Sequence, residues 1–352
     1  MATKPLQFGL IGGGAIAQAH MKNLSADPRT EIRWLAEVNP ETLAKNVETF
    51  TLTHTTTDYQ QMLQDPGLDA VIVCTPPAFH GVIGQDVLSA GKHLLMEKPL
   101  CLSLEDARAL LASAQANPEL KVSGCSCRHA RLNPKFAFVK RMIDEGDLGD
   151  IYYVHHRAVS RQGRGGIESQ PGSKWFLNRK IAGGGPLFDW GVYDLSFHLG
   201  VLGEPECAHI ESFCMNGLDR VDPGTPIFDV EEHGAAFITF TNGMRFCWER
   251  ANNAHAVIPN QTTIYGTKGG LTFGYCTWDS PEIEYCYVDD DGKGKAAQQT
   301  LTVDMSLHTD DMFALTNAYV AYLLDEGPVP MPLELEVKNL AILLEVYRAA
   351  GW

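Results

Sequence analysis

Apolar and polar positions alternate between two periods over the first ~120 residues. Short apolar runs are separated by stretches in which apolar residues recur at helical spacing. The runs are Gln7–Ile11, Ile32–Ala36, Ala70–Cys74 and His93–Met96, and helical stretches begin near Ala15, Glu41, Gly81 and Leu104. Because the runs barely alternate, we expect strands buried on both faces, as in a parallel sheet covered by helices. The pattern predicts a doubly wound α/β domain over residues 1–122.

A different pattern begins after about residue 121. The predicted elements are a helix over 134–145, a strand over 151–156, hairpins through 205–303 with turns at Asn242-Gly243 and at 289–292, and two final helices near 311–324 and 335–350. Several of these strands are apolar at consecutive positions, so we expect helices on one face of the sheet and another subunit on the other. The pattern predicts an α+β domain with an open, mostly antiparallel sheet over residues 123–352, whose final helices can pack back on the first domain.

Length, charge and cysteine usage narrow the class of protein. The 352 residues suit two domains, and 43 acidic against 28 basic residues give a net charge of −15. Such a charge argues against nucleic acid or an anionic membrane as partner and leaves small molecules. No apolar run approaches the ~20 residues of a membrane helix, and we expect a cytoplasmic protein without a signal peptide. Nine scattered cysteines predict reduced thiols and no metal site.

A glycine-rich turn separates the first predicted strand from the first predicted helix. Gly12–Ala17 fits the dinucleotide pattern, in which one glycine makes the turn, the next admits a pyrophosphate and the alanine allows helix–strand packing. Glu37 ends the second strand roughly 20 residues further on, where a carboxylate binds the adenosine ribose and repels a 2′-phosphate. Val38 and Asn39 add no cation that would favour NADP. We expect NAD; the alternative is a plain turn with a solvated carboxylate.

Five motifs in sequence order resemble one family. They are Gly12–Ala17, Thr75–His80, Gly91–His93, Glu97–Pro99 and Gly183–Gly191. Together they resemble the Gfo/Idh/MocA oxidoreductases, which include glucose–fructose oxidoreductase, inositol dehydrogenase and dihydrodiol dehydrogenase. The resemblance runs from residue 6 to the C-terminal helices. It implies an N-terminal Rossmann domain, a C-terminal domain with an open antiparallel sheet, and homo-oligomers, dimers or tetramers, formed through that sheet.

The glycine turn and the resemblance together predict a cofactor site. The residues expected to contact the dinucleotide are Gly12, Gly14, Ala15, Ile16, Ala17, Glu37, Thr75, Pro76, His80, Glu97, Lys98 and Arg128. Arg128 is included because members of the family often have an arginine near this position, close to the cofactor. Lys98 follows the strand His93–Met96, so it stands at the carboxyl edge of a parallel sheet, where open α/β folds bind ligands. We therefore expect a functional lysine there rather than a solvated charge.

A second glycine-rich segment carries candidate catalytic residues. After the turn at Gly183–Gly185, Asp189 and Tyr193 lie four residues apart on a predicted helix and so share a face. Gly191 between them indicates the close approach of a ring or of backbone. The family usually carries His where this chain has Tyr193 and Asp where it has Ser196. Tyrosine at this position resembles glucose–fructose oxidoreductase and the dihydrodiol dehydrogenases.

Oxidation of a secondary alcohol requires a base for the hydroxyl proton. Tyrosine, whose ordinary pKa is about 10, acts as a base when a cation stabilises its anion. Lys98 can supply that charge, and Asp189 can orient the lysine or bind a substrate hydroxyl, so we prefer Lys98 and Tyr193 as the proton-transfer pair. His198 is the alternative, because its ordinary pKa suits neutral pH and Asp194 lies four residues before it.

Substrate contacts are expected from the loop 160–175 as well. Arg161, Arg164 and Lys174 can meet a carboxylate or simply solvate the loop, and Trp175 can stack on a sugar face. The residues expected to contact substrate are Lys98, Trp175, Asp189 and Tyr193.

The sequence thus predicts an NAD(H)-dependent oxidoreductase that transfers a hydride between nicotinamide and a ring secondary hydroxyl or ketone of a sugar, glycoside or cyclic polyol. Two alternatives stay open. One is a redox-neutral enzyme that retains NAD and acts on glycosides through a 3-keto intermediate. The other is a non-catalytic, dinucleotide-dependent regulatory protein, against which the retention of Lys98 and Asp189 counts.

Overall fold

The computed structural model describes residues 4–218, 227–288, 294–306, 308 and 310–352. The turn predicted at 289–292 lies outside these residues. By its internal contacts the chain divides into unit 1 (Met1–Arg128 and Thr309–Leu340) and unit 2 (His129–His308 and Ala341–Trp352). None of the described helices is both long and apolar enough to cross a membrane.

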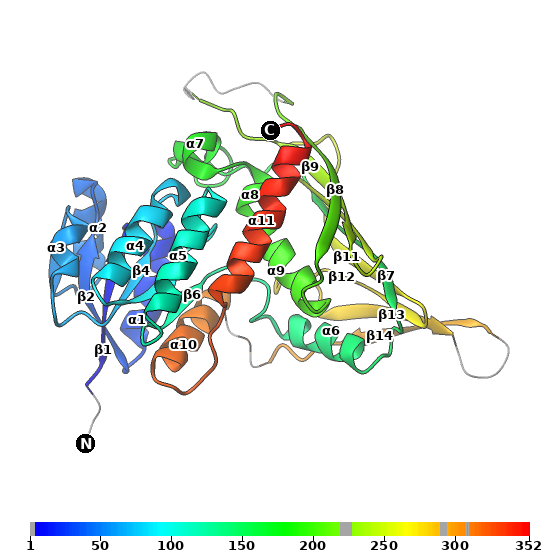
Figure 1. Cartoon of the computed structure of the whole chain (residues 1–352), viewed down its shortest axis with the longest axis horizontal. Helices are drawn as coiled ribbons and strands as arrows, with labels where there is room; N and C mark the ends of the chain where they lie inside the picture. The colour runs from blue at the N-terminus through cyan, green and yellow to red at the C-terminus, as the bar shows by residue number, and fades with distance from the viewer. Residues whose placement is uncertain (1–3, 219–226, 289–293, 307, 309) are drawn as a thin grey trace. The chain divides into compact units, whose positions relative to one another are not determined.

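Unit 1 is built on a six-stranded parallel sheet (Figure 1). Its strands are β1 (Leu6–Ile11), β2 (Thr30–Ala36), β3 (His54–Thr56), β4 (Ala70–Val73), β5 (His93–Met96) and β6 (Val122–Gly124), in the order β3-β2-β1-β4-β5-β6. β4 is buried along its whole length, which explains its unbroken apolar sequence. The strand order reverses between β1 and β4, and open α/β sheets bind ligands at such a point. The predicted Rossmann fold is confirmed.

Helices cover both faces of this sheet. They are α1 (Ala15–Ala26), α2 (Pro40–Thr49), α3 (Tyr59–Leu63), α4 (His80–Ser89) with the short 3₁₀ helix η1 (Pro77–Phe79) before it, α5 (Leu104–Ala116) and α10 (Asp311–Leu323). Right-handed crossovers that leave β1 in opposite directions place α1 and α2 on one face and α4 and α5 on the other. The late helix α10 packs on α1, and its Tyr319 ring lies 6.4 Å from that of Phe8.

Unit 2 contains an eight-stranded sheet. Its strands are β7 (Ile151–Val159), β8 (Cys207–Met215), β9 (His233–Phe240), β10 (Arg245–Ala251), β11 (Ile258–Gly266), β12 (Gly269–Phe273), β13 (Glu282–Val288) and β14 (Ala296–Thr302). Their order is β14-β13-β12-β11-β7-β10-β9-β8, and β7 and β10 run parallel while the other neighbours run antiparallel. Asn242-Gly243 turns β9 into β10, with Gly243 at φ +84°. The predicted open, mostly antiparallel sheet is confirmed.

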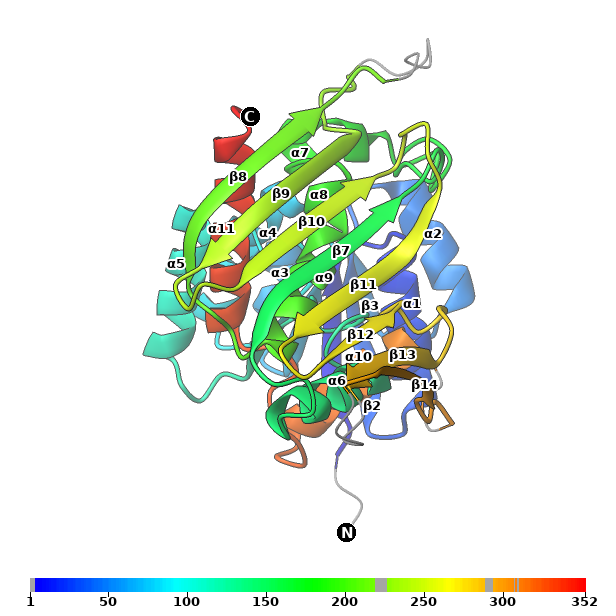
Figure 2. The same cartoon turned by 90° about the vertical axis from the view of Figure 1, so that its right-hand side faces the viewer.

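The two faces of this sheet differ. The remaining elements of unit 2 are α6 (Pro134–Asp144), the 3₁₀ helix η2 (Lys174–Leu177), α7 (Arg179–Ala182), α8 (Pro186–Asp189), α9 (Gly191–Val201) and the second half of α11 (Leu333–Ala349), whose first half belongs to unit 1. α6, α8 and α9 lie behind the sheet in Figure 2, and all residues of α9 are buried. Burial alternates along β9 and β10, so Ile238 and Phe246 face these helices while Phe237 is exposed on the other face.

Candidate active site

The glycine turn between β1 and α1 has the form of an anion site. Gly12 has φ +96°, and a Cβ there would lie 2.8 Å from the Cys74 carbonyl oxygen, so only glycine fits. Gly14 is the N-cap of α1, and no side chain caps the helix. A Cβ on Gly14 would meet no atom within 4 Å. The first-turn amides of α1 therefore have no side-chain acceptor, and the helix dipole favours a phosphate beside them.

Glu37 extends the site from the end of β2. Its Oε2 accepts a hydrogen bond from the Gly13 amide at 2.6 Å, and its Oε1 accepts one from the Asn39 amide at 2.7 Å. Two amides thus fix the carboxylate beside the glycine turn, and its remaining lone pairs can accept ribose hydroxyls. The neighbouring Val38 and Asn39 are exposed and uncharged. The residues present fit NAD, because they offer a pyrophosphate site and a carboxylate that opposes a 2′-phosphate.

His80 joins the ends of two strands. Its Nε2 lies 2.8 Å from the Thr75 carbonyl oxygen after β4, and its Nδ1 lies 2.8 Å from the Pro99 carbonyl oxygen after β5. Burial lowers the pKa of this ring, which is fully enclosed. The hydroxyl of Thr75 is buried and, among the described residues, makes no hydrogen bond. His80 thus holds the backbone on either side of the site, and the Thr75 hydroxyl is available to a ligand.

Glu97 points into unit 1 and pairs with Arg128. Its Oε1 accepts from Arg128 Nη1 at 2.7 Å and lies 3.0 Å from His20 Nε2, while its Oε2 accepts from the Lys98 amide at 3.1 Å. Burial raises the pKa of Glu97, but Arg128 and His20 outweigh burial and hold it well below its usual range. Cys125 adds a third potential metal ligand, yet burial raises the pKa of its thiol and Arg128 already neutralises Glu97. We interpret the cluster as an ion pair that supports the Lys98 backbone.

The carboxyl ends of neighbouring strands therefore meet at one edge. The glycine turn follows β1, Glu37 follows β2, Thr75 follows β4, and half-buried Lys98 follows β5 two residues after its end. These strands are consecutive in the sheet, in the order β2-β1-β4-β5. A parallel sheet brings such residues together by its geometry alone.

In unit 2 a buried glutamate holds the second glycine turn. Glu231 accepts hydrogen bonds from the amides of Gly185 at 2.6 Å and Leu187 at 2.9 Å, which caps the one-turn helix α8. Burial raises the pKa of Glu231 despite these bonds. A Cβ on Gly185 would overlap the Glu231 carbonyl oxygen, so the turn requires glycine at this position. Asp189, half-buried at the end of α8, borders a cavity of about 20 Å³, room for a single water.

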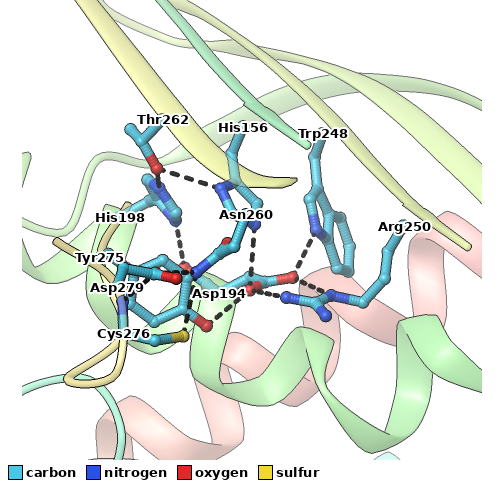
Figure 3. A network of polar contacts seen from close by, with 10 residues as sticks. All are labelled: His156, Asp194, His198, Trp248, Arg250, Asn260, Thr262, Tyr275, Cys276 and Asp279. Atoms are coloured by element: carbon cyan, nitrogen blue, oxygen red, sulfur yellow. Dashed lines mark hydrogen bonds and ion pairs between the residues drawn. The ribbon is translucent and has the colours of Figure 1, made fainter. Parts of the chain in front are cut away.

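Asp194 attaches α9 to the sheet (Figure 3). Its carboxylate, fully buried, accepts two hydrogen bonds from Arg250, both at 2.7 Å, one from Trp248 Nε1 at 2.9 Å and one from the Tyr275 hydroxyl at 2.7 Å. Burial raises the pKa of Asp194, but Arg250 and His156 outweigh it and hold it well below its usual range. Since Asp194 is the next residue after Tyr193, this network fixes the backbone that carries the tyrosine.

His198 belongs to the same network (Figure 3). Its Nδ1 lies 2.6 Å from the Asp194 carbonyl oxygen and must carry the hydrogen, because a carbonyl only accepts. Burial lowers the pKa of His198 to about 3, so its Nε2 accepts from the Thr262 hydroxyl at 2.8 Å. The Thr262 oxygen in turn accepts from His156 Nδ1 at 3.0 Å. Both nitrogens of His198 are thus bonded inside the protein.

Two family models match the chain. One, described as an oxidoreductase family with an NAD-binding Rossmann fold, matches residues 6–123, and the other, a GFO/IDH/MocA C-terminal domain, matches residues 136–272. The chain belongs to the Gfo/Idh/MocA oxidoreductase family. The predicted resemblance is confirmed, and with it an NAD-binding Rossmann domain.

The chain is similar to several dehydrogenases of the Gfo/Idh/MocA family. Levoglucosan dehydrogenase of Pseudarthrobacter phenanthrenivorans is 27% identical, covering 82% of this chain and 78% of the relative. D-glucoside 3-dehydrogenase of Escherichia coli is 26% identical, covering 90% and 88%. Among solved structures, levoglucosan dehydrogenase in complex with NADH and levoglucosan has a TM-score of 0.83 at 22% identity, covering 99% of this chain and 98% of that one. The last similarity shows the fold alone.

The residues of unit 2 predicted to contact substrate, Trp175, Asp189 and Tyr193, differ from one another in their surroundings. Tyr193 is 1% exposed, and its ring lies 4.7 Å from that of His129 and 5.3 Å from that of Trp190. Trp175 lies on η2 and stacks on Phe176 at 3.9 Å. The predicted single helix through Asp189 and Tyr193 is wrong, since Trp190 separates α8 from α9. The predicted close approach at Gly191 is confirmed, because a Cβ there would overlap the Trp248 ring.

The basic residues of the loop 160–175 have partners within unit 2. Arg164 donates to Glu168 at 2.7 Å and contacts Glu232 at 3.4 Å, and Arg161 donates to Asn253. Both arginines therefore bind protein groups, and Arg164 is buried rather than solvated as a charge on the loop surface.

Proposed function

We propose that the protein is an NAD(H)-dependent oxidoreductase that transfers a hydride to or from a ring secondary alcohol or ketone of a sugar, glycoside or cyclic polyol. The observation that carries the proposal is the edge of unit 1 where β1, β2, β4 and β5 end in the glycine turn, Glu37, Thr75 and Lys98. The glycine turn, Glu37 and Thr75 fit a dinucleotide, so Lys98 remains to contact the part of the substrate that reacts. Two relatives named for carbohydrate substrates, levoglucosan and D-glucosides, support the substrate class.

In this proposal Lys98 and Tyr193 handle the proton. Bound NAD(H) supplies or accepts the hydride. Tyr193 exchanges a proton with the substrate hydroxyl, and the Lys98 ammonium stabilises the negative charge that develops on oxygen. Asp189 binds a substrate hydroxyl or orients Lys98. Lys98 has the position after β5 that this role requires, and Asp189 and Tyr193 lie in and just after the glycine-rich segment Gly183–Gly191.

The surroundings of His198 favour Tyr193 as the proton-exchanging residue. His198 is fully buried, both of its nitrogens are bonded to Asp194 and Thr262, and burial lowers its pKa to about 3. A histidine with that pKa is a weak base at neutral pH, and it has no free nitrogen for a substrate. These facts support a structural role for His198 and leave Tyr193 for catalysis.

The test is NADH absorbance with a panel of polyols, monosaccharides and glycosides, combined with product analysis. We expect net NADH formation with at least one ring alcohol. Lys98→Met lowers kcat/KM by about 10²- to 10⁴-fold, whereas Lys295→Met, an exposed lysine, leaves it unchanged. Turnover without net NADH would instead indicate retained NAD and a 3-keto intermediate. No turnover, with NAD binding intact in Lys98→Met, would favour the regulatory protein.

The proposal also includes a homo-oligomer formed through the sheet of unit 2. The face away from α6, α8 and α9 exposes Phe213 and Phe237 to 48% and 39%. Burial of such a face against a second copy would remove apolar surface from water. Light scattering should give a mass of at least twice 38.7 kDa, and Phe237→Lys should reduce it. A monomer at micromolar concentration would contradict this part.

A further inference from the structure

Trp278 is an exposed tryptophan in the turn that follows β12. Its side chain is 60% exposed, whereas tryptophan is highly buried on average in folded proteins. The ring lies edge-on to His129, with centroids 5.3 Å apart at 71°, and to Trp190, at 5.7 Å and 90°. An exposed tryptophan with two aromatic neighbours offers apolar area to a ligand.

Ring contacts connect Trp278 to the proposed catalytic tyrosine. His129 and Trp190 lie nearly parallel, 5.5 Å apart at 22°, and both contact the ring of Tyr193. Tyr193, His129, Trp190 and Trp278 thus form an aromatic wall that begins at a buried ring and ends at an exposed one. His129 and Trp190 contact the Tyr193 ring directly, and Trp278 contacts these two rings in turn.

Hydrogen bonds from Lys135 and within the turn itself hold the backbone of the turn that carries Trp278. The fully buried Lys135 at the start of α6 donates from Nζ to the carbonyls of Gly274 at 2.8 Å, Cys276 at 2.7 Å and Asp279 at 3.3 Å. The Asp279 carboxylate accepts from the Cys276 amide at 2.9 Å and from Asn260 at 2.7 Å (Figure 3). The exposed indole therefore stands on a backbone held by several bonds, and such preorganisation favours binding.

We propose that Trp278 forms an aglycone subsite: it contacts the flat apolar face of the group attached to a sugar ring that reacts at Tyr193. The inference rests on the proposed function and narrows its substrate class to glycosides. In this proposal the reacting ring lies at the Tyr193 end of the aromatic wall, and a second ring joined to it lies against Trp278. A free monosaccharide leaves Trp278 uncovered. The second ring is either an aryl aglycone or another sugar, because both present a flat face to an indole.

The experiment compares Trp278→Ala and Trp278→Phe with the unchanged protein. The probes are methyl and phenyl glycosides of glucose, galactose and mannose in both anomers, together with cellobiose. In Trp278→Ala, KM for two-ring substrates rises about three- to tenfold, while kcat and the KM for methyl glycosides change less than about twofold. Trp278→Phe retains most of the affinity, and Phe313→Ala, a matched exposed aromatic in unit 1, changes neither constant. A larger loss for phenyl glycosides than for cellobiose identifies an aryl aglycone, and the reverse identifies a sugar.

Calorimetric binding of the same glycosides in the presence of NAD separates this inference from the proposed function. Binding that depends on Trp278, with no turnover of these glycosides or of the polyols and monosaccharides tested for the proposed function, keeps the subsite and refutes the oxidoreductase proposal. The subsite is overturned if the unchanged protein binds two-ring glycosides no more tightly than methyl glycosides. It is equally overturned if Trp278→Ala weakens one-ring and two-ring ligands by the same factor.

Discussion

The sheet edge of unit 1 and helix α9 of unit 2 hold their candidate functional side chains in different ways. At the edge, Glu37 directly follows β2 and Lys98 lies two residues after the end of β5, and the bonds of Glu37 go to the backbone amides of Gly13 and Asn39. In α9 the backbone beside Tyr193 is held by the carboxylate of Asp194, whose partner Arg250 lies 56 residues further along the chain. Glu37 is thus held by backbone amides, whereas the backbone beside Tyr193 is held by distant side chains. Side-chain substitutions far from the site should therefore affect the position of Tyr193 more than that of Glu37.

The largest effect is expected from Tyr193→Phe compared with His198→Asn. Removal of the phenol hydroxyl should lower kcat by about 10²- to 10⁴-fold with little change in stability, because the buried ring is retained. His198→Asn removes an internally bonded ring, so it should lower the unfolding midpoint and leave kcat within about tenfold. Steady-state kinetics and guanidinium unfolding on the same samples measure both. Intact turnover in Tyr193→Phe together with its loss in His198→Asn would reverse the assignment.

Arg250→Met breaks the long-range arrangement directly. Asp194 would keep a buried charge without its guanidinium, and loss of one partner of a buried ion pair costs about 3–5 kcal/mol of unfolding free energy. Asp194→Asn combined with Arg250→Met should recover part of that loss, since no charge is then left alone. Denaturant unfolding gives the values.

Arg141→Met is the matched control, because Arg141 pairs with Glu145 on the exposed surface of α6. Exposed pairs of this spacing contribute about 0.3–0.5 kcal/mol. Equal losses in Arg250→Met and Arg141→Met would remove the proposed difference between the two regions.

Features held by residues close together in the chain could be predicted from the sequence, and features held by distant residues could not. The glycine turn, Glu37 and Lys98 are recognisable because strand, turn and helix follow each other within a few residues. In unit 2 the hairpin at Asn242-Gly243 and the close approach at Gly191 have similarly local signals. The parallel pairing of β7 with β10 has none, so nothing indicated which side chains would face α9.

The spacing of Asp194 and His198 explains why the sequence left His198 as an alternative to Tyr193. Asp194 and His198 are four residues apart, which is also the spacing of a catalytic pair on a helix. In the structure Asp194 contacts His198 through its backbone carbonyl and directs its carboxylate to Arg250. Glu231 gave no signal, because its amide partners lie 46 and 44 residues earlier in the chain.

Glu97→Gln tests whether unit 1 also has a charge-dependent part. Burial raises the pKa of Glu97, but Arg128 and His20 hold it well below its ordinary 4.5, so the carboxylate stabilises the fold at neutral pH. Below pH 4.5 the unfolded chain binds a proton that the folded chain does not, and this stabilisation is lost as pH falls. Glu97→Gln should therefore be about 2–3 kcal/mol less stable at pH 7. Its difference from the unchanged protein should shrink in acid, as urea unfolding across pH would measure. A difference independent of pH would mean that packing, rather than charge, is what Glu97 contributes.

Glu37→Gln should produce the smallest effect and locates the nucleotide preference in one side chain. The amide keeps an acceptor for only one of the two backbone N–H groups, Gly13 or Asn39, and loses the negative charge that opposes a 2′-phosphate. The ratio of NAD to NADP affinity should fall about tenfold, with little change in stability, because the surrounding backbone holds the turn. Glu41→Gln, which removes a nearby exposed charge at the start of α2, serves as control and should leave the ratio unchanged. Calorimetry with both nucleotides measures it. Equal shifts in the two variants would mean that the general acidity of this surface, and not the carboxylate held by Gly13 and Asn39, selects the cofactor.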